Sequence, residues 1–143
     1  MKNTSENDIL NYIDDFFKSV DISLAELEKI GSLLIIFGYS NFFYAADVDI
    51  LETKEINNTG KSPSTITATG QQYISTGYVI LWVVSIKRMQ QIEKKNIGKT
   101  NKIPLAPYRL VANTYLLSVF ANALRLEGFT EIDKIDKNKE FIE

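Results

Sequence analysis

The sequence predicts an all-α protein: a short N-terminal amphipathic helix plus three long apolar helices in an antiparallel bundle. Apolar residues recur at three- and four-residue spacing through most of the 143-residue chain, and no period-two segments are joined by a hairpin turn. Three long stretches carry no charged side chain, namely Ile30 to Ala46, Ser62 to Ile86 and Leu110 to Leu124. No shift in composition divides the chain, so residues 1–143 are expected to form a single helical domain.

The N-terminal segment, residues 1–21, is predicted to be the short amphipathic helix. Ile9, Tyr12, Phe16 and Val20 recur at helical spacing, with aspartate and lysine residues between them. This pattern is typical of a helix with one apolar and one polar face.

A second helix is predicted over residues 24–56. Ser23 and Glu26 match a capping box, and Ile22 and Leu27 stand at the two positions of a hydrophobic staple. No proline interrupts the segment, so it is expected to run on through the first uncharged stretch.

The third helix is predicted over residues 71–97, after a connector rich in Gly, Ser, Thr and Asn. Val79 to Val84 alone would suit a buried strand. Helix is favoured because the polar continuation keeps helical spacing through Met89 and Ile92. Gly98 offers a stop.

The fourth helix is predicted over residues 107–127, opened by a first-turn proline. Gly128 is expected to end it, because Leu124 and Phe129 then occupy the two contacting positions of a Schellman motif. The tail, residues 128–143, is predicted to be a frayed helical turn or disordered.

The uncharged stretches imply more apolar helical surface than one bundle can cover. A helix in a monomeric bundle shows about half its circumference to water and needs charged residues there. Two environments could cover the remaining apolar surface, a lipid bilayer or other copies of the same chain in an obligate oligomer. An ordinary monomeric bundle is the third reading.

Features of the connectors favour the bilayer, whereas the lengths of the stretches oppose it. The segment Lys87 to Arg109 holds seven of the 16 basic residues, which would place it on the cytoplasmic side. A bare span needs about 20 apolar residues, but two of the stretches have only 17 and 15 uncharged ones. The sequence therefore does not decide between the bilayer and the oligomer.

Small residues at seven-residue spacing, Gly31, Gly38 and Ala45, predict a helix-packing interface, a groove into which a neighbouring helix fits closely. The alternative is that two glycines merely weaken a long helix, by about 1 kcal/mol each. Three amides lie inside uncharged stretches, namely Asn41, Asn113 and Asn122. Each would seek a partner on another helix if buried, or would instead face solvent.

A basic cluster follows the third helix's apolar part. Lys87, Arg88, Lys94 and Lys95 are candidates for contact with anionic lipid headgroups, each contributing about 1 kcal/mol beside a membrane. The alternative is a solvated helix end whose positive charges complement the helix dipole.

Two GK[ST] strings, at Gly60 and Gly98, do not predict a phosphate loop. Each lacks the glycine five residues earlier, and each follows a helix where the motif requires a strand. The carboxylates around Asp49 and Glu52 match no calcium loop. No cofactor and no metal site is therefore expected.

The chain contains no histidine and no cysteine, so common general bases, thiol nucleophiles and thiolate metal sites are missing. We expect no catalytic residue and no enzymatic activity. A net charge of −2 gives no electrostatic reason to expect nucleic acid, and no small-molecule substrate is evident. The N-terminus lacks the order of a cleaved signal peptide.

These observations lead to two functional hypotheses. The first is a non-enzymatic, membrane-resident or membrane-associated assembly component, with lipid or copies of itself as partners. The alternative is a soluble helical-bundle module, structural or protein-binding, which buries its uncharged stretches in an obligate oligomer and would be cytoplasmic.

Overall fold

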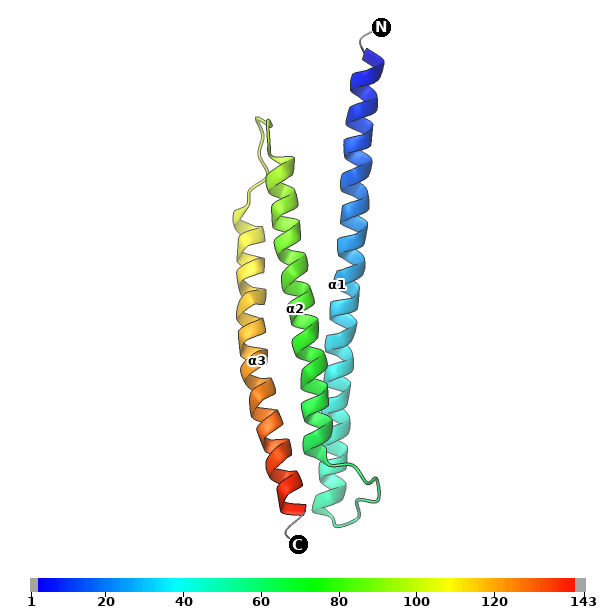
Figure 1. The fold of residues 1–143 in the computed structure, drawn as a ribbon, viewed down its shortest axis with the longest axis vertical. Coiled ribbons are helices and arrows are strands. Elements are labelled where there is room, and N and C mark those ends of the chain that lie inside the picture. Colours follow the sequence, from blue (N-terminus) through cyan, green and yellow to red (C-terminus); the bar gives the residue numbers. More distant parts are fainter. Residues whose placement is uncertain (1–2, 141–143) are drawn as a thin grey trace.

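The computed structural model describes residues 3–140, with the side chains of residues 3–7, 10, 139 and 140 excepted. It contains three helices in these residues, α1 (Asn3–Thr53), α2 (Pro63–Lys95) and α3 (Ala106–Glu140). The chain runs down α1, up α2 and down α3 (Figure 1). The prediction of an all-α chain with packed helices is confirmed.

The helices form an open array with α2 in the middle. α2 packs along both α1 and α3, whereas the backbones of α1 and α3 do not approach each other within the described residues. α1 is the longest helix, and its N-terminal end extends past the α2–α3 connection (Figure 1). Consequently α2 is the one helix of the described chain that packs along the backbone of α1 or of α3, and α1 and α3 meet through side chains near the C-terminal end of α3.

The predicted break between residues 1–21 and 24–56 was wrong, because α1 is one continuous helix of 51 residues. The Ser23 hydroxyl does not cap a new helix but donates to the carbonyl of Ser19 one turn earlier, 3.0 Å away. With no glycine or proline before Gly31, nothing interrupts the backbone ladder.

α1 ends in a Schellman motif. The Ile56 amide donates to the Leu51 carbonyl at 3.0 Å, and the Glu55 amide donates to the Glu52 carbonyl at 2.9 Å. Glu55 takes the left-handed conformation, with φ 57°, that glycine usually supplies at this position. The connection to α2 starts here.

α2 begins at Pro63, eight residues before the predicted start of the 71–97 helix, and ends at Lys95. Ser62 has the extended backbone of an N-cap residue, and proline is well suited to the first helical turn. The run of threonines and Gly70 resembled a loop by composition. Packing against α1 overrides that composition, since the added turns carry Ile66 and Gly70, both buried.

Asn96 organises the α2–α3 connection. Its side-chain Nδ2 donates to the Ile103 carbonyl at 2.9 Å and its Oδ1 accepts from the Ile103 amide at 2.8 Å. These two bonds hold the connection, residues 96–105, folded around the buried side-chain amide of Asn96.

α3 does not stop at the predicted C-cap, Gly128, and instead continues to Glu140, so residues 128–140 are not a frayed tail. Phe129 packs edge-to-face on Phe42 of α1, with ring centroids 5.5 Å apart. This contact, with a polar cluster around Asp133, supports the extra turns. The end of the predicted tail, residues 141–143, lies outside the described residues.

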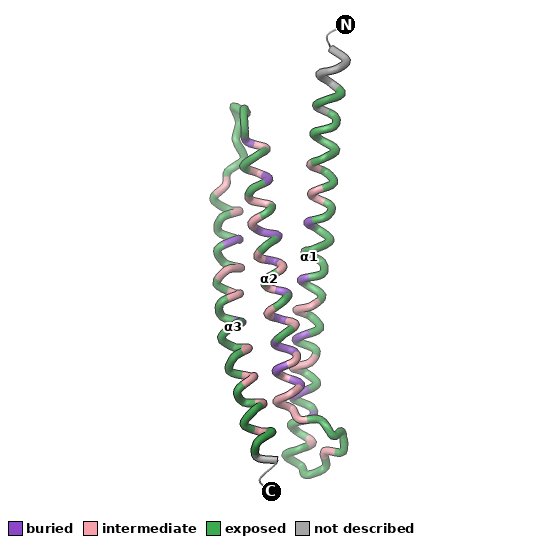
Figure 2. Tube along the Cα trace, viewed as in Figure 1, coloured by how far each residue is buried: buried purple, intermediate pink, exposed green. Residues whose placement is uncertain are grey.

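Buried residues gather along α2 and along the sides of α1 and α3 that face it (Figure 2). On α1 they include Leu24, Gly31, Gly38 and Ala45, a seven-residue spacing typical of helices that supercoil around each other. Only one line of each outer helix is therefore part of the core.

The α1–α2 contact depends on two glycine pairs. A Cβ added at Gly38 would lie 2.5 Å from Ile74 Cγ1 and 2.6 Å from the Gly70 carbonyl oxygen. A Cβ added at Gly77 would lie 2.6 Å from the Gly31 carbonyl oxygen. At both levels, backbone meets backbone with no room for a side chain.

No helix within residues 3–140 has an apolar run long enough to cross a membrane. The membrane-spanning helices expected from the uncharged stretches are therefore not found in this part of the chain.

We predict that Gly38→Ala destabilises the fold by about 1–3 kcal/mol, because the added methyl group collides with the α2 backbone. This loss opposes the gain of about 1 kcal/mol that alanine normally brings to a helix interior. The measurement is urea unfolding followed by circular dichroism at fixed protein concentration.

Gly128→Ala is the matched control, since nothing lies within 4 Å of the added Cβ. It is expected to stabilise the protein by about 0.5–1 kcal/mol through helix propensity alone. Equal effects of the two substitutions would show that close packing at Gly38 does not determine the helix spacing.

Candidate interaction surfaces

The outer side of α3 carries a stripe of large apolar side chains. The side of α3 that faces α2 includes Ala112 and Asn122, both buried. On the opposite side, the stripe residues remain 62–70% exposed. They are Leu110, Leu117, Phe120 and Leu124, and we call them the α3 stripe. Three of the four recur every seven residues, so they form one line along the helix.

α1 also leaves a broad apolar surface uncovered. Its exposed large side chains between residues 30 and 50 are Ile30, Leu33, Ile36, Phe37, Tyr39, Phe43, Tyr44 and Ile50. They remain exposed because, within the described residues, α2 covers one side of α1 and α3 reaches α1 only through the Phe129–Phe42 contact. The first uncharged stretch is thus mostly outside the core (Figure 2).

The predicted groove residues lie in the contact between α1 and α2. Gly31 and Gly38 face Gly77 and Gly70, as described above. Ala45 is buried beside Val48 and belongs to the small apolar cluster at that end of the helix pair. These positions are occupied by the chain's own α2, so they do not form a free surface.

The predicted basic cluster divides into two kinds of residue. Arg88 pairs with Glu28 at 2.7 Å, and Lys95 pairs with Asp21 at 3.2 Å while lying over the Phe17 ring. Lys87 and Lys94 are exposed. Two of the four charges therefore join α2 to α1, and the predicted lipid contact stays a prediction.

A buried amide pair joins α2 to α3. Gln71 Nε2 donates to Asn122 Oδ1 at 2.9 Å, and Ser75 Oγ donates to the Asn122 carbonyl at 3.2 Å. Gln71 Oε1 accepts no hydrogen bond from the described residues, which costs free energy of about 1–3 kcal/mol. The pair therefore adds register between the helices more than net stability.

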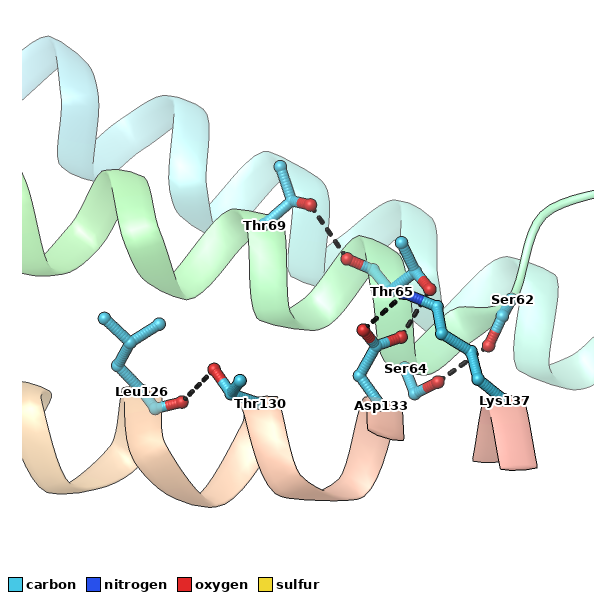
Figure 3. A network of polar contacts seen from close by, with 8 residues as sticks. All are labelled: Ser62, Ser64, Thr65, Thr69, Leu126, Thr130, Asp133 and Lys137. Atoms are coloured by element: carbon cyan, nitrogen blue, oxygen red, sulfur yellow. Dashed lines mark hydrogen bonds and ion pairs between the residues drawn. The ribbon is translucent and has the colours of Figure 1, made fainter. Parts of the chain in front are cut away.

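A second polar cluster lies between the start of α2 and the last turns of α3 (Figure 3). The Thr65 hydroxyl donates to Asp133, and Lys137 pairs with the same carboxylate at 2.7 Å. Burial raises the pKa of Asp133, but hydrogen bonds from Lys137, Thr65 and Ser64 outweigh it and hold the pKa below its usual value.

Several hollows lie between the helices, including the following two. One, of about 670 Å³, is at the foot of the array beside Lys61, Asn57 and Lys137. The other, of about 260 Å³, is lined mainly by apolar side chains of α2 and α3, with the Glu28–Arg88 pair at its edge. Neither collects the acids, bases and oriented donors that an active site requires.

The α3 stripe is not predicted from the sequence as a distinct surface, although its signal is present there. Leu110, Leu117 and Leu124 recur every seven residues, but a second line with the same spacing runs beside them at Ala112, Val119 and Leu126. Because two lines of apolar residues run through one segment, the segment is apolar at most positions and neither line stands out in the sequence. Burial distinguishes the two lines, because Ala112 is buried and Val119 and Leu126 are half-buried, whereas the leucines of the stripe are exposed.

No model of a protein family, no curated protein and no solved structure matches the chain.

Asp133→Asn is predicted to lower the free energy of unfolding by about 1 kcal/mol at pH 7, because the ion pair with Lys137 is lost. Since folding lowers the pKa of Asp133 from 3.8, its contribution is present above that pH and disappears as pH falls through the folded-state pKa. Urea unfolding of the native chain and of Asp133→Asn at pH 7 and pH 3 measures the loss in unfolding free energy at each pH.

Asp14→Asn, an exposed position on α1, serves as the control and should change stability little at either pH. If the difference in unfolding free energy between Asp133→Asn and the native chain is as large at pH 3 as at pH 7, the ionised Asp133 carboxylate is not the source of the stabilisation.

Proposed function

We propose that the protein is a non-catalytic helical assembly module that joins other helices through its apolar outer faces. The observation that carries this proposal is the α3 stripe, a straight line of large side chains that no part of the described chain covers. Contiguous exposed apolar surface of this kind marks interaction sites in folded proteins.

The shape of the stripe favours a helix as the partner. Leucines at seven-residue spacing present one narrow line, as in helix pairs that interlock their side chains. A lipid environment would require apolar residues around most of the circumference, whereas Asn113, Arg109 and Arg125 are exposed next to the stripe.

The energetics require an apolar face on the partner too. Burying four large side chains contributes about 1.5–3 kcal/mol each, about 6–12 kcal/mol in total. Association costs about 4–15 kcal/mol in lost translational and rotational freedom. One stripe alone therefore contributes about as much as association costs, whereas two complementary stripes, at about 12–24 kcal/mol, exceed most of the range of that cost.

We propose no enzymatic role. The chain has no histidine and no cysteine. Among the described residues, the groups with a shifted pKa are Asp133 and Lys134, and both owe the direction of the shift to neighbours in structural ion pairs. Such shifts are expected in ion-pair networks that serve only packing.

The test uses fluorescence-detected sedimentation velocity of the labelled full chain in extracts of cells that produce it. The native chain is expected to sediment as an assembly larger than its 16.2 kDa mass. Leu117→Glu should shift it towards the free chain, because a charge then lies in the apolar contact.

Gln72→Glu is the matched control, since it adds one negative charge at an exposed position of α2 and should leave the assembly unchanged. A native chain that sediments as a monomer in the extract, or one whose assembly ignores Leu117→Glu, would contradict the proposed function.

A further inference from the structure

We propose that the partner of the α3 stripe is a second copy of the chain, whose α3 lies antiparallel to the first. This inference rests on the proposed function and goes beyond it by naming the occupant, its direction and its register.

The stripe is self-complementary. Along the outer side of α3, Leu110, Asn113, Leu117, Phe120 and Leu124 follow one another at alternating spacings of three and four residues. This spacing defines a seam that a similar seam can fill. A two-fold pair uses the same patch on both copies, which is the commonest arrangement in homo-oligomers.

Charge decides the direction of the pair. The next position of the seam after Leu124 is Glu127, which is exposed. In a parallel pair, Glu127 would face Glu127 of the second copy and Arg109 would lie beside the second copy's Arg109. Like charges in such positions oppose association.

An antiparallel pair brings opposite charges together. In an antiparallel pair, the numbers of two facing residues always add up to the same value. When Leu117 lies opposite Phe120 of the second copy, Leu110 therefore lies opposite Glu127 of that copy, and Arg109 lies beside the same Glu127. Within the described residues, neither Arg109 nor Glu127 has an ion-pair partner in its own chain. Two Arg109–Glu127 pairs would therefore form, one at each end of the interface.

The first experiment measures the mass of the purified full chain by sedimentation equilibrium. The native chain is expected to be a dimer, Leu117→Glu to raise the Kd for dimerisation by at least about 100-fold, and Gln72→Glu to leave it unchanged. A native chain that remains a monomer, or a dimer insensitive to Leu117→Glu, would overturn the inference.

Single cysteines test direction, because the chain has none of its own. The two-fold axis passes between positions 118 and 119, so two Ala121→Cys sites are about 8 Å apart along the helices and two Leu110→Cys sites about 25 Å apart. A short bismaleimide linker should join the former and not the latter. Equal cross-linking of both variants would indicate a parallel pair and contradict the proposal.

Charge reversal tests the register. Arg109→Glu and Glu127→Arg are each expected to weaken the dimer by about 3- to 10-fold, because each places like charges side by side. The double variant should restore the affinity. Additive weakening in the double variant would contradict the assigned register.

The extract and the purified chain separate the two proposals. If the chain assembles in the extract through Leu117 but is monomeric when purified, the proposed function stands and this inference fails. If the chain is monomeric in both, both fail.

Discussion

The backbone contact between α1 and α2 is the constraint on which the rest of the structure depends. Gly38 meets Gly70 and Gly31 meets Gly77 at distances that admit no side chain, so α1 must lie directly on one side of α2. α3 occupies another side, held by the Gln71–Asn122 pair and the Asp133 cluster. α2 thereby becomes the central helix, and each outer helix packs along α2 for most of the contact it makes within the described residues.

This placement explains where the apolar residues go. α2 has two neighbours and buries much of its uncharged stretch, whereas α1 and α3 have further apolar lines that no part of the described chain covers (Figure 2). Exposed apolar surface of this extent is unusual for a chain that acts alone. The fold and the proposed assembly therefore have a common origin in the open, three-helix arrangement.

Local sequence signals predicted the helices better than their ends. The helical class followed from the spacing of apolar residues, but packing overrides the two cap signals. Helix α1 continues through Ser23 as its buried residues pack on α2, and α3 continues past Gly128 with Phe129 packed on Phe42. The start of α2 was missed because threonines and Gly70 resemble a loop, and their role depends on α1. The α3 stripe could not be separated from the inner line of α3 without knowing which side α2 covers.

The most direct test of the central claim, that a second copy of the chain covers the outer face of α3, is the thermal midpoint of the purified full chain. It is measured over a 100-fold range of protein concentration, about 1–100 μM. Because association stabilises only the folded state, self-assembly through this face predicts a midpoint that rises with concentration. A midpoint that does not change, together with a monomeric mass at every concentration, would contradict the claim.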